Sequence, residues 1–559
     1  MGKPTLYSQQ MIDEYRSKGY WTAETFADLY DQRAREHPDR EAIVDAKARF
    51  TWREIKQWTD RVALGLLDAG YKKNDILVVH LPNWAEIPLF RIACEKAGIV
   101  SMAVPWALRH KEMEYILKET RASGIVITRK FHQFDYFKMT ADIRPALPGL
   151  RHVLVVGDDV PPGAVSVTEM SERPLEGKYP SDYLDRTKFG AFEYSWIQLT
   201  SGSTGFPKFV EAPICGKIYS GKMFLKATRL TGDDVCGIFA LGPVGPNLTG
   251  NMGSPQVGAK MALLERFTPE EALRFIEKEK ITLLGVVPTM LSKMIEAPDF
   301  DSYDLKSLRA VIVTGSPLPP SLAEAAEEKM GPIVQYYGSV DFGGISLPYI
   351  DVPRNVRLHT SNRLCPGTQA KLIDEQGKEA APGRAGELAV RGPACNAGYY
   401  KDPETTWKTW AEDGWFRTGD LATFDEEGYL LIVGRIKDVI IRGGQNINPA
   451  EVENLLMEHP KVTGAALVGM PDAVMGEKAC AYVVLNPGEA LAFDEMVAFL
   501  REKNIAAYKL PERLEILQQL PLVPGSGKVN KKLLAEAIAE KLRDEKNATK
   551  LRCEENAEK

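Results

Sequence analysis

The sequence has no long apolar segment of the kind that membrane and secreted proteins carry. None of its apolar runs approaches the roughly 20 residues that a helix needs to cross a bilayer. The first ten residues, MGKPTLYSQQ, lack the apolar core of a signal peptide. Leu6 also stands where an N-myristoylation motif has Ser or Thr. We therefore expect a cytoplasmic protein with no membrane partner.

Cysteine is scarce, and charge of the two signs is nearly balanced. The chain of 559 residues has seven cysteines and no C-x-x-C pair, which favours free buried thiols over disulfides or a zinc site. Its 70 basic and 76 acidic residues give a net charge of −6. This charge is mild for the length and gives no reason to expect nucleic acid as a partner.

Three common nucleotide and metal motifs are absent too. No Gly-Lys pair is followed by Ser or Thr, no G-x-G-x-x-G element occurs, and there is no H-E-x-x-H. The first absence excludes the Walker-type phosphate loop. The other two argue against Rossmann oxidoreductases and zincin metalloproteases.

What is present is an alternation of helical and β-rich segments, in a chain too long for one hydrophobic core. Residues 51–128 alternate as TWREIKQWTDRVALGLLDAG, DILVVHL, WAEIPLFRIACEKAG, IVSMAV, HKEMEYILKETRA and GIVIT. This pattern predicts an α/β protein with parallel sheets covered by helices. The same rhythm resumes later with PEEALRFIEKEK, ITLLGVV and LRAVIVTG.

The second half of the chain changes character. Between about residues 353 and 433, Gly, Pro and short β-like runs predict a small β-barrel or meander. A compact α+β pattern follows. We therefore expect a core over residues 1–434, a joint at 435–438, a small domain over 439–540 and a charged, frayed tail over 541–559.

One stretch, LTSGSTGFPK at residues 199–208, gathers glycine and hydroxyl side chains around one lysine. It follows the predicted strand EYSWIQL, so it lies where doubly wound folds bind ligands. Backbone N–H, hydroxyl and ammonium groups there would suit a polyphosphate. The spacing alone fits an idle turn equally well.

Five elements, in order along the chain, resemble the pattern of the adenylate-forming superfamily, which comprises acyl-CoA synthetases, adenylation domains and luciferases. They are LTSGSTGFPK, YYGSVD at 336–341, GWFRTGD at 414–420, GRIKDVIIRGGQNINPAEVE at 434–453 and PGSGKVNKK at 524–532. The resemblance implies a large N-terminal domain of two helix-covered sheets plus a small β-barrel, followed by a small mobile α+β domain. It also implies ATP, Mg²⁺ and CoA as cofactors.

The resemblance further implies a nucleotide site. Asp420 would accept bonds from both ribose hydroxyls rather than serve as an ordinary turn or cap aspartate, and Arg435 would contact ribose or phosphate rather than solvent. The implied contacts to phosphate and adenine are Thr200, Ser201, Gly202, Ser203, Thr204, Gly205, Lys208, Gly315, Ser316, Pro317, Tyr336, Tyr337, Gly338 and Ser339. A strand-ending turn at residues 315–317 and aromatic core residues at 336–337 are the alternative.

Lys528, in GSGKV, resembles the catalytic lysine of the superfamily. The acid and the α-phosphate are both anions, so a cation between them would lower the cost of bringing them together. Lys208 and Lys437 are the other two lysines that the resemblance makes catalytic, Lys437 at the hinge about which the small domain swings. After that swing, Gly443, Gly444 and Gln445 would border the channel for the CoA thiol.

Three positions depart from the superfamily pattern. Asp341 stands at the metal position, where Glu is usual, and it is still able to ligate Mg²⁺ directly or through water. Val340 replaces a hydroxyl-bearing residue, as in the subgroup that activates aryl acids. Pro246 replaces the His of a His-Asn pair found in related aryl-acid enzymes, which puts in doubt a hydrogen bond or thiol-tunnel gate.

The acid pocket is expected around ALGPVGPNLTG, at 240–250. Asn247 either contacts the acid or caps the following segment, and the two interpretations stand equal. The predicted lining is Asn247, Leu248, Met252, Gly315 and Gly338. This short, wide and apolar pocket suits a ring carboxylate better than a long chain or an amino acid.

The expected function is therefore an AMP-forming acyl-CoA ligase for an aromatic or alicyclic acid, such as benzoate or a cyclohexene or cyclohexane carboxylate. The chain looks closest in character to the CoA ligases of such acids and to dihydroxybenzoate-AMP ligases. The alternative is an enzyme that loads an aryl acid onto a separate carrier protein. A non-catalytic nucleotide sensor is the third interpretation, and the retained Lys528 and Asp420 argue against it.

Overall fold

The computed structural model describes residues 7–200, 207–239, 248–347, 349–381, 383–410, 414–443, 445–472, 474–523 and 528–557, with the backbone alone for 248–249 and 546–557. The chain forms two compact units. The larger comprises Met1–Gly315, Ala326–Ala370 and Val390–Arg417, and the smaller comprises Ser316–Ala325, Lys371–Ala389 and Thr418–Lys559. The predicted hinge at residues 435–438 stays a prediction.

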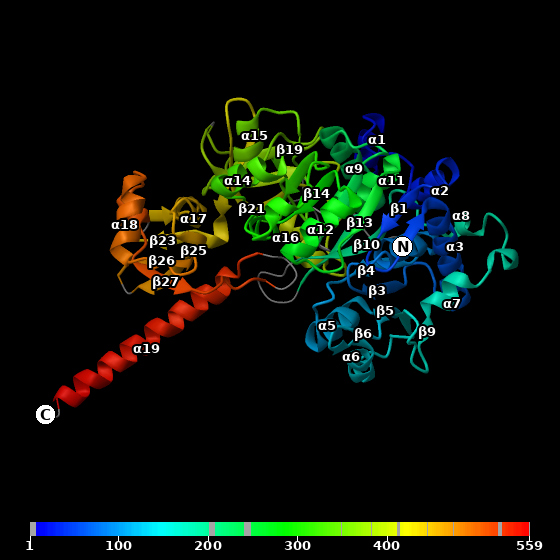
Figure 1. Ribbon diagram of the computed structural model, residues 1–559, viewed down its shortest axis with the longest axis horizontal. Helices are drawn as coiled ribbons and strands as arrows, with labels where there is room; N and C mark the ends of the chain where they lie inside the picture. Colours follow the sequence, from blue (N-terminus) through cyan, green and yellow to red (C-terminus); the bar gives the residue numbers. More distant parts are fainter. Residues whose placement is uncertain are drawn as a thin grey trace. The chain divides into compact units, whose positions relative to one another are not determined.

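Two seven-stranded sheets form the framework of the larger unit (Figure 1). The first has the order β11-β10-β4-β3-β5-β8-β9 and the second the order β16-β15-β14-β12-β13-β1-β2. The strands of the first sheet are β3 Ile76–His80, β4 Val100–Ala103, β5 Gly124–Thr128, β8 His152–Val156, β9 Val165–Ser166, β10 Tyr194–Leu199 and β11 Phe209–Pro213. Those of the second are β1 Glu41–Val44, β2 Arg49–Thr51, β12 Val235–Ile238, β13 Lys260–Leu263, β14 Leu283–Val286, β15 Ala310–Val313 and β16 Ile333–Gln335.

Both sheets are parallel except at one edge each, where β10 pairs with β11 and β1 pairs with β2 in antiparallel fashion. This confirms the predicted parallel sheets. Two short hairpins accompany them, β6 Lys130–Phe131 with β7 Phe134–Asp135 and β17 Gly338–Ser339 with β18 Gly343–Gly344.

Helices connect the strands, as parallel pairing requires. Those of the larger unit are α1 Gln9–Ser17, α2 Phe26–Glu36, α3 Trp52–Asp68, α4 Glu86–Ala97, α5 His110–Thr120, α6 Tyr136–Ile143, α7 Val167–Glu172, α8 Tyr183–Thr187, α9 Ile214–Thr228, α11 Ser254–Val257, α12 Pro269–Glu279, α13 Pro288–Ile295, α15 Arg354–His359 and α16 Pro403–Thr409. Helix α14, Pro320–Met330, spans residues of both units.

Helix α3 illustrates how the sequence sets these elements. Thr51 accepts a hydrogen bond from the Glu54 backbone, and the Glu54 carboxylate accepts one from the Thr51 backbone, so a capping box begins the helix. Trp52, Ile55 and Val62 then recur on the buried face. The predicted helix at residues 51–70 is therefore confirmed.

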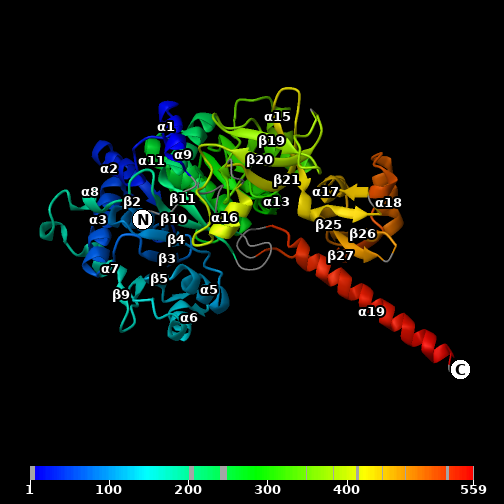
Figure 2. The ribbon, with the colours of Figure 1, turned by 180° about the vertical axis from the view of Figure 1, so that it is seen from behind.

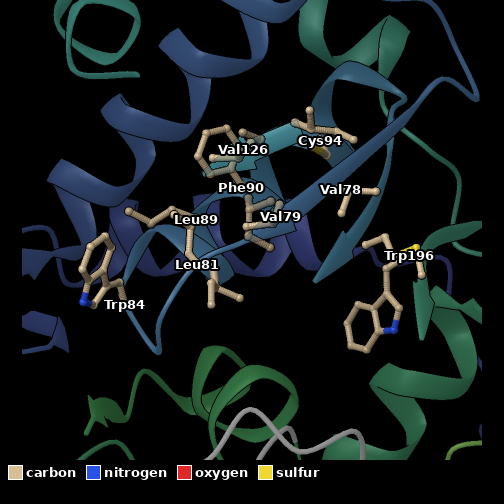
Figure 3. Close-up of a cluster of buried hydrophobic side chains, with 14 of the residues drawn as sticks. Val78, Val79, Leu81, Trp84, Leu89, Phe90, Cys94, Val126 and Trp196 are labelled. Carbon is tan, nitrogen blue, oxygen red and sulfur yellow. The ribbon is translucent and has the colours of Figure 1, made fainter. Parts of the chain in front are cut away.

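A hydrophobic core fills the larger unit between sheet and helices. Figure 3 shows Phe90 and Leu89 of α4 beside Val79 of β3, with Val126 of β5 behind them. All four side chains are buried. Helix α4 is buried on every side, since each residue from Ile87 to Ala97 is covered.

The region where a small β-barrel was predicted divides between the two units, and the α+β pattern beyond it belongs to the smaller one. A four-stranded sheet has the order β19-β20-β21-β22, from β19 Gln369–Ile373, β20 Gly386–Arg391, β21 Phe416–Phe424 and β22 Leu430–Arg435. A second sheet has the order β24-β23-β26-β25, with β27 on β26. Its elements are β23 Ile440–Arg442, β24 Gln445–Ile447, α17 Pro449–Met457, β25 Val462–Asp472, β26 Gly476–Leu485, α18 Phe493–Glu502 and β27 Arg513–Leu517.

The charged tail is helical, not frayed as predicted. Helix α19 runs from Lys531 to Ala557 and extends away from the sheet of its own unit in both views (Figures 1 and 2). Ion pairs from Lys541 to Glu515 and from Arg513 to Glu545 fasten its middle turns to β27. Across the described ranges, no helix combines the length and apolar character that a membrane crossing demands.

Candidate active site

The two ends of the Gly-rich stretch, Thr200 and Lys208, lie at the edge of the first sheet, next to the paired strands β10 and β11. Leu199 of β10 faces Phe209 of β11, the Thr200 N–H donates to the Lys208 carbonyl at 3.0 Å, and the Lys208 N–H donates to the Thr200 hydroxyl at 3.0 Å. The two ends of the loop are therefore closed on each other. Ser201, Gly202, Ser203, Thr204 and Gly205 lie outside the described residues.

The predicted metal element forms a second hairpin in the same unit. Strands β17 and β18 pair antiparallel, and Asp341 lies in the turn between them. The Ser339 hydroxyl donates to one carboxylate oxygen of Asp341 at 2.9 Å, and the Tyr399 hydroxyl donates to the other at 2.7 Å. A single half-buried carboxylate is thus oriented by two hydroxyl groups.

Asp341 suits a magnesium ion that keeps most of its water. Its oxygens are the hard ligands that Mg²⁺ prefers. Within the described ranges, no cluster of three or more His, Cys, Asp or Glu side chains could form a metal cage. A site of one carboxylate completed by water and substrate phosphate therefore fits the residues present.

Lys208 and Asp341 both contact the side chain of Tyr399. The Lys208 ammonium nitrogen lies 4.6 Å from the centroid of the Tyr399 ring. The structure thereby brings together two residues that the sequence predicted separately, Lys208 and Asp341, around Tyr399, which the sequence did not single out. A cation and a carboxylate beside the phosphate loop are what a metal–polyphosphate substrate requires.

The predicted adenine contacts fall on the ends of β15 and β16. Gly315 has φ +97°, a conformation that favours glycine, and it ends the turn that follows β15. Tyr336 is buried in the core, 7% exposed, and its hydroxyl fills the space where any side chain at Gly344 would lie. Tyr337 is half-buried. Tyr336 thus packs as the core alternative describes, and the adenine role stays a prediction for both residues.

The predicted acid pocket is described in part. Asn247 and the Leu248 side chain lie outside the described residues. Met252 is buried in the π-helical turn Leu248–Gly253. The backbone of Gly338 is crowded by Gly343 and Gly344, since a Cβ there would lie 2.7 Å from the Gly343 carbonyl oxygen.

Arg91 of α4, which the sequence did not single out, supports the π-helical turn. Its guanidinium lies between the rings of Phe26 and Trp196, at 4.0 and 3.8 Å from their centroids, and it donates to the Asn251 carbonyl at 3.3 Å. Burial lowers the pKa of Arg91 to about 10. The group lines a cavity of about 100 Å³ with residues of β3, β4 and β10, and Met252, Gly315 and Gly338 are not among them.

In the smaller unit, Asp420 and Arg435 face each other across β21 and β22. The Arg435 Nε donates to the Asp420 carboxylate at 2.7 Å, and the Asp420 side chain is buried. Lys437 follows in a short 3₁₀ turn. Partial burial, and then the Arg435 guanidinium, lower the pKa of Lys437. The structure thus brings the predicted ribose aspartate, its arginine and the predicted hinge lysine together.

The predicted CoA residues form a tight hairpin. Arg442 of β23 faces Gln445 of β24, and Gly443, with φ +55°, donates its N–H to the Met475 carbonyl at 2.8 Å. Gly444 lies outside the described residues. Arg442 forms an ion pair with Glu512 at 2.6 Å, which anchors strand β23 of this hairpin.

Lys528 lies on the stem of another hairpin. The Val523 N–H donates to the Lys528 carbonyl at 2.7 Å, and Leu522 bridges Val529.

Ser316 and Pro317 also belong to the smaller unit, where both are at least partly exposed. The site residues therefore divide between the two units.

Comparisons with known proteins give two family matches and a series of similar enzymes. The model of the AMP-binding enzyme family matches residues 30–400, and that of the AMP-binding enzyme C-terminal domain matches residues 451–528. The chain is 31% identical to the 2,3-dihydroxybenzoate-AMP ligase of Bacillus subtilis, over 96% of this chain and 98% of that one. It is 32% identical to the medium-chain fatty-acid–CoA ligase of Escherichia coli, over 97% and 95%.

One further relative and one solved structure are also similar to this chain. The chain is 32% identical to the 2-hydroxy-7-methoxy-5-methyl-1-naphthoate–CoA ligase of Streptomyces carzinostaticus, over 94% of this chain and 95% of that one. The fold matches the anthranilate CoA ligase AuaEII in complex with anthranoyl-AMP, with TM-score 0.82 and 23% identity over 93% and 98%. Adenylate-forming enzymes use ATP and Mg²⁺, and their CoA ligases use CoA. The chain belongs to the AMP-binding enzyme family and is an ATP-dependent enzyme that activates an acid as its adenylate.

Proposed function

We propose that the enzyme joins an aromatic or alicyclic carboxylic acid to CoA. The observation that carries the ring preference is the π-helical turn Leu248–Gly253, which contributes the buried Met252 and contains no acidic residue to hold an ammonium group. Two relatives act, by their names, on ring acids. A relative of equal identity is named for fatty acids, which makes linear acids the competing class.

In the proposed first half-reaction, a carboxylate oxygen attacks the α-phosphorus of ATP. A new P–O bond forms, the bond from the α-phosphorus to the bridging oxygen breaks, and pyrophosphate leaves. Lys528 offsets the repulsion between the two anions, and Lys208 with Thr200 holds the departing phosphates. Mg²⁺ held by Asp341 would offset the charge that develops on those phosphates.

In the proposed second half-reaction, the CoA sulfur attacks the acyl carbon of the adenylate. A C–S bond forms, the acyl C–O bond breaks, AMP leaves with the electron pair, and the thiol proton passes to solvent. Gly443 and Gln445 border the approach of the thiol in this proposal. Glycine presents no side chain at that place, which favours the passage of a pantetheine arm.

The second candidate is an enzyme that transfers the acyl group to a carrier protein. The similarity to an enzyme named as an AMP ligase, at 31% identity against 32% for the two CoA ligases, favours this candidate. Free CoA separates the two. Thioester formation with CoA in the absence of any carrier supports the ligase, whereas adenylate that accumulates without reacting with CoA supports the carrier-loading enzyme.

A panel of acids tests the proposed substrate. Benzoate, cyclohexanecarboxylate, hexanoate and octanoate would each be offered with ATP, Mg²⁺ and CoA, and AMP release would be measured. We expect kcat/KM for the better ring acid to exceed that of either linear acid by at least about tenfold, since one misfitted methylene in an apolar pocket changes it by 10- to 200-fold. A linear acid as the best substrate would refute the ring preference.

An Asp420→Asn variant tests the ribose contact. The amide cannot accept two charge-assisted bonds, so the KM for ATP should rise by about 10- to 100-fold. The wild type should discriminate against 2′-deoxy-ATP and 3′-deoxy-ATP, and the variant should lose most of that discrimination. Asp425→Asn, at the turn of the same hairpin, is the matched control. Unchanged discrimination in Asp420→Asn would remove the ribose role.

A further inference from the structure

We propose that Tyr399 is a positioning residue for the metal–phosphate site, one that orients the Asp341 carboxylate with its hydroxyl and holds the Lys208 ammonium over its ring. The proposal rests on the proposed metal role of Asp341. It extends that role to a residue 58 positions further along the chain, in a segment that none of the five sequence elements includes.

The Tyr399 side chain contacts both the Asp341 carboxylate and the Lys208 ammonium. Its hydroxyl donates to Asp341 at 2.7 Å, and its ring centroid lies 4.6 Å from the Lys208 ammonium. Tyr399 is itself 6% exposed, so these contacts form in a largely water-free place. Low local polarity strengthens both the charge-assisted hydrogen bond and the cation–π contact.

The backbone of Tyr399 is fixed next to the β10–β11 hairpin. Residues 398–400 pair with β11, because Tyr399 bridges Val210, Glu211 donates to the Gly398 carbonyl at 2.9 Å and Tyr400 donates to the Phe209 carbonyl at 2.7 Å. The Tyr399 N–H donates to the Thr406 hydroxyl at 2.9 Å. The backbone that carries the ring is therefore paired with the strand that begins one residue after Lys208.

The same segment also holds the metal element. The Asn396 side-chain amide donates to the backbone carbonyl of Val340, the residue before Asp341. The Tyr399 ring packs edge-on against Trp410, with centroids 5.3 Å apart. Residues 396–400 therefore contact both the β10–β11 hairpin and the β17–β18 hairpin.

The arrangement has a chemical reason. Among the described residues no ion pair joins Lys208 to Asp341, and the Tyr399 side chain contacts both groups. A direct ion pair would use up the charges that the phosphates and the metal need. Aspartate is also one methylene shorter than the usual glutamate. The hydroxyls of Ser339 and Tyr399 donate to its two oxygens and so orient the shorter carboxylate toward the metal position that a glutamate would reach without them.

The test removes the hydroxyl alone. Tyr399→Phe keeps the ring and its contact with Lys208, and it should raise the Mg²⁺ concentration for half-maximal ATP–pyrophosphate exchange by about tenfold, within the range found for residues that orient metal ligands. Calorimetry of ATP binding without any acid should show weaker binding in the presence of Mg²⁺ and unchanged binding in its absence. Melting curves monitor the fold.

Two further variants sharpen the result. Tyr400→Phe loses a hydroxyl of the adjacent residue, which lies 3.5 Å from the Thr120 carbonyl, and should leave the Mg²⁺ dependence unchanged. In an Asp341→Asn background, Tyr399→Phe should have little additional effect, because its action passes through Asp341. An unaltered Mg²⁺ dependence in Tyr399→Phe, or an equal effect in both backgrounds, would overturn the inference. Failure of the proposed substrate class would appear instead in the wild type, which would bind Mg²⁺-ATP normally and reject ring acids.

Discussion

A Lys528→Ala variant is expected to lose adenylate formation by a factor of about 100 to 1,000 while it still converts a supplied adenylate into the thioester. The first half-reaction joins two anions, and removing one preorganised positive group from such a step typically costs that factor. The second half-reaction involves a neutral acyl carbon and a thiol, so it does not need this cation. The loss should therefore be confined to one of the two steps.

Separate assays of the two steps make this prediction decisive. Exchange of labelled pyrophosphate into ATP reports the first step, and thioester formation from a synthetic benzoyl-adenylate and CoA reports the second. Lys532→Ala is the matched control, because Lys532 is a 65% exposed lysine on α19 of the same unit. Equal losses in both steps, or an equal loss in the control, would refute the assigned role.

A Lys96→Ala variant is expected to destabilise the larger unit by about 3 to 5 kcal/mol, the range found when one partner of a buried ion pair is removed. The Lys96 side chain is 3% exposed, and its ammonium lies 2.6 Å from Asp31 of α2 and also pairs with Asp60 of α3. One cation on α4 thus joins three helices. Its removal leaves Asp31 and Asp60 with the more exposed Lys56 as their remaining counterion.

Lys56 provides the control within the same cluster. It pairs with Asp31 at 3.2 Å and with Asp60 at 2.6 Å, but its side chain is 38% exposed. Lys56→Ala should therefore cost no more than about 1 kcal/mol. The midpoints of urea unfolding, followed by far-UV circular dichroism, would compare the variants. Equal midpoints for the two would contradict the burial argument.

The same cluster predicts an acid dependence. Burial alone would raise the pKa of Asp31, but the lysines Lys96 and Lys56 outweigh it and lower the pKa below its usual value. A carboxylate whose folded-state pKa is depressed contributes stability above its unfolded pKa and loses it as the pH falls through the folded value. The stability advantage of the wild type over Lys96→Ala should therefore shrink below pH about 4.

Local sequence patterns predicted the elements that are periodic and well capped. Helix α3, with its capping box and regular apolar spacing, and strand β3, a short β-rich run, lie where the sequence placed them. Each depends on residues that are close in the chain. The family pattern was likewise visible in short motifs, because the chemistry it serves is carried by a few side chains at fixed local spacing.

Contacts between distant segments escaped the sequence. The Tyr399 hydroxyl meets Asp341 only because residues 398–400 pair with β11, and no local pattern states that pairing. The burial of Tyr336, whose nucleotide role stays a prediction, depends on the glycines of the neighbouring hairpin. The tail was mistaken for frayed chain because charge alone was weighed, whereas ion pairs from Lys541 and Glu545 to β27 support the middle of its helix.

The crowding of Gly344 by the Tyr336 hydroxyl has a consequence for variation at this position. A single added methyl group would have to displace an aromatic side chain from the core. The hairpin that bears Asp341 would then move with it, since Gly344 pairs with Gly338 in that hairpin. Mutations that replace this glycine should therefore be eliminated during evolution of the enzyme even where the nucleotide contacts themselves are intact, and a laboratory library randomised at codon 344 should return glycine almost alone.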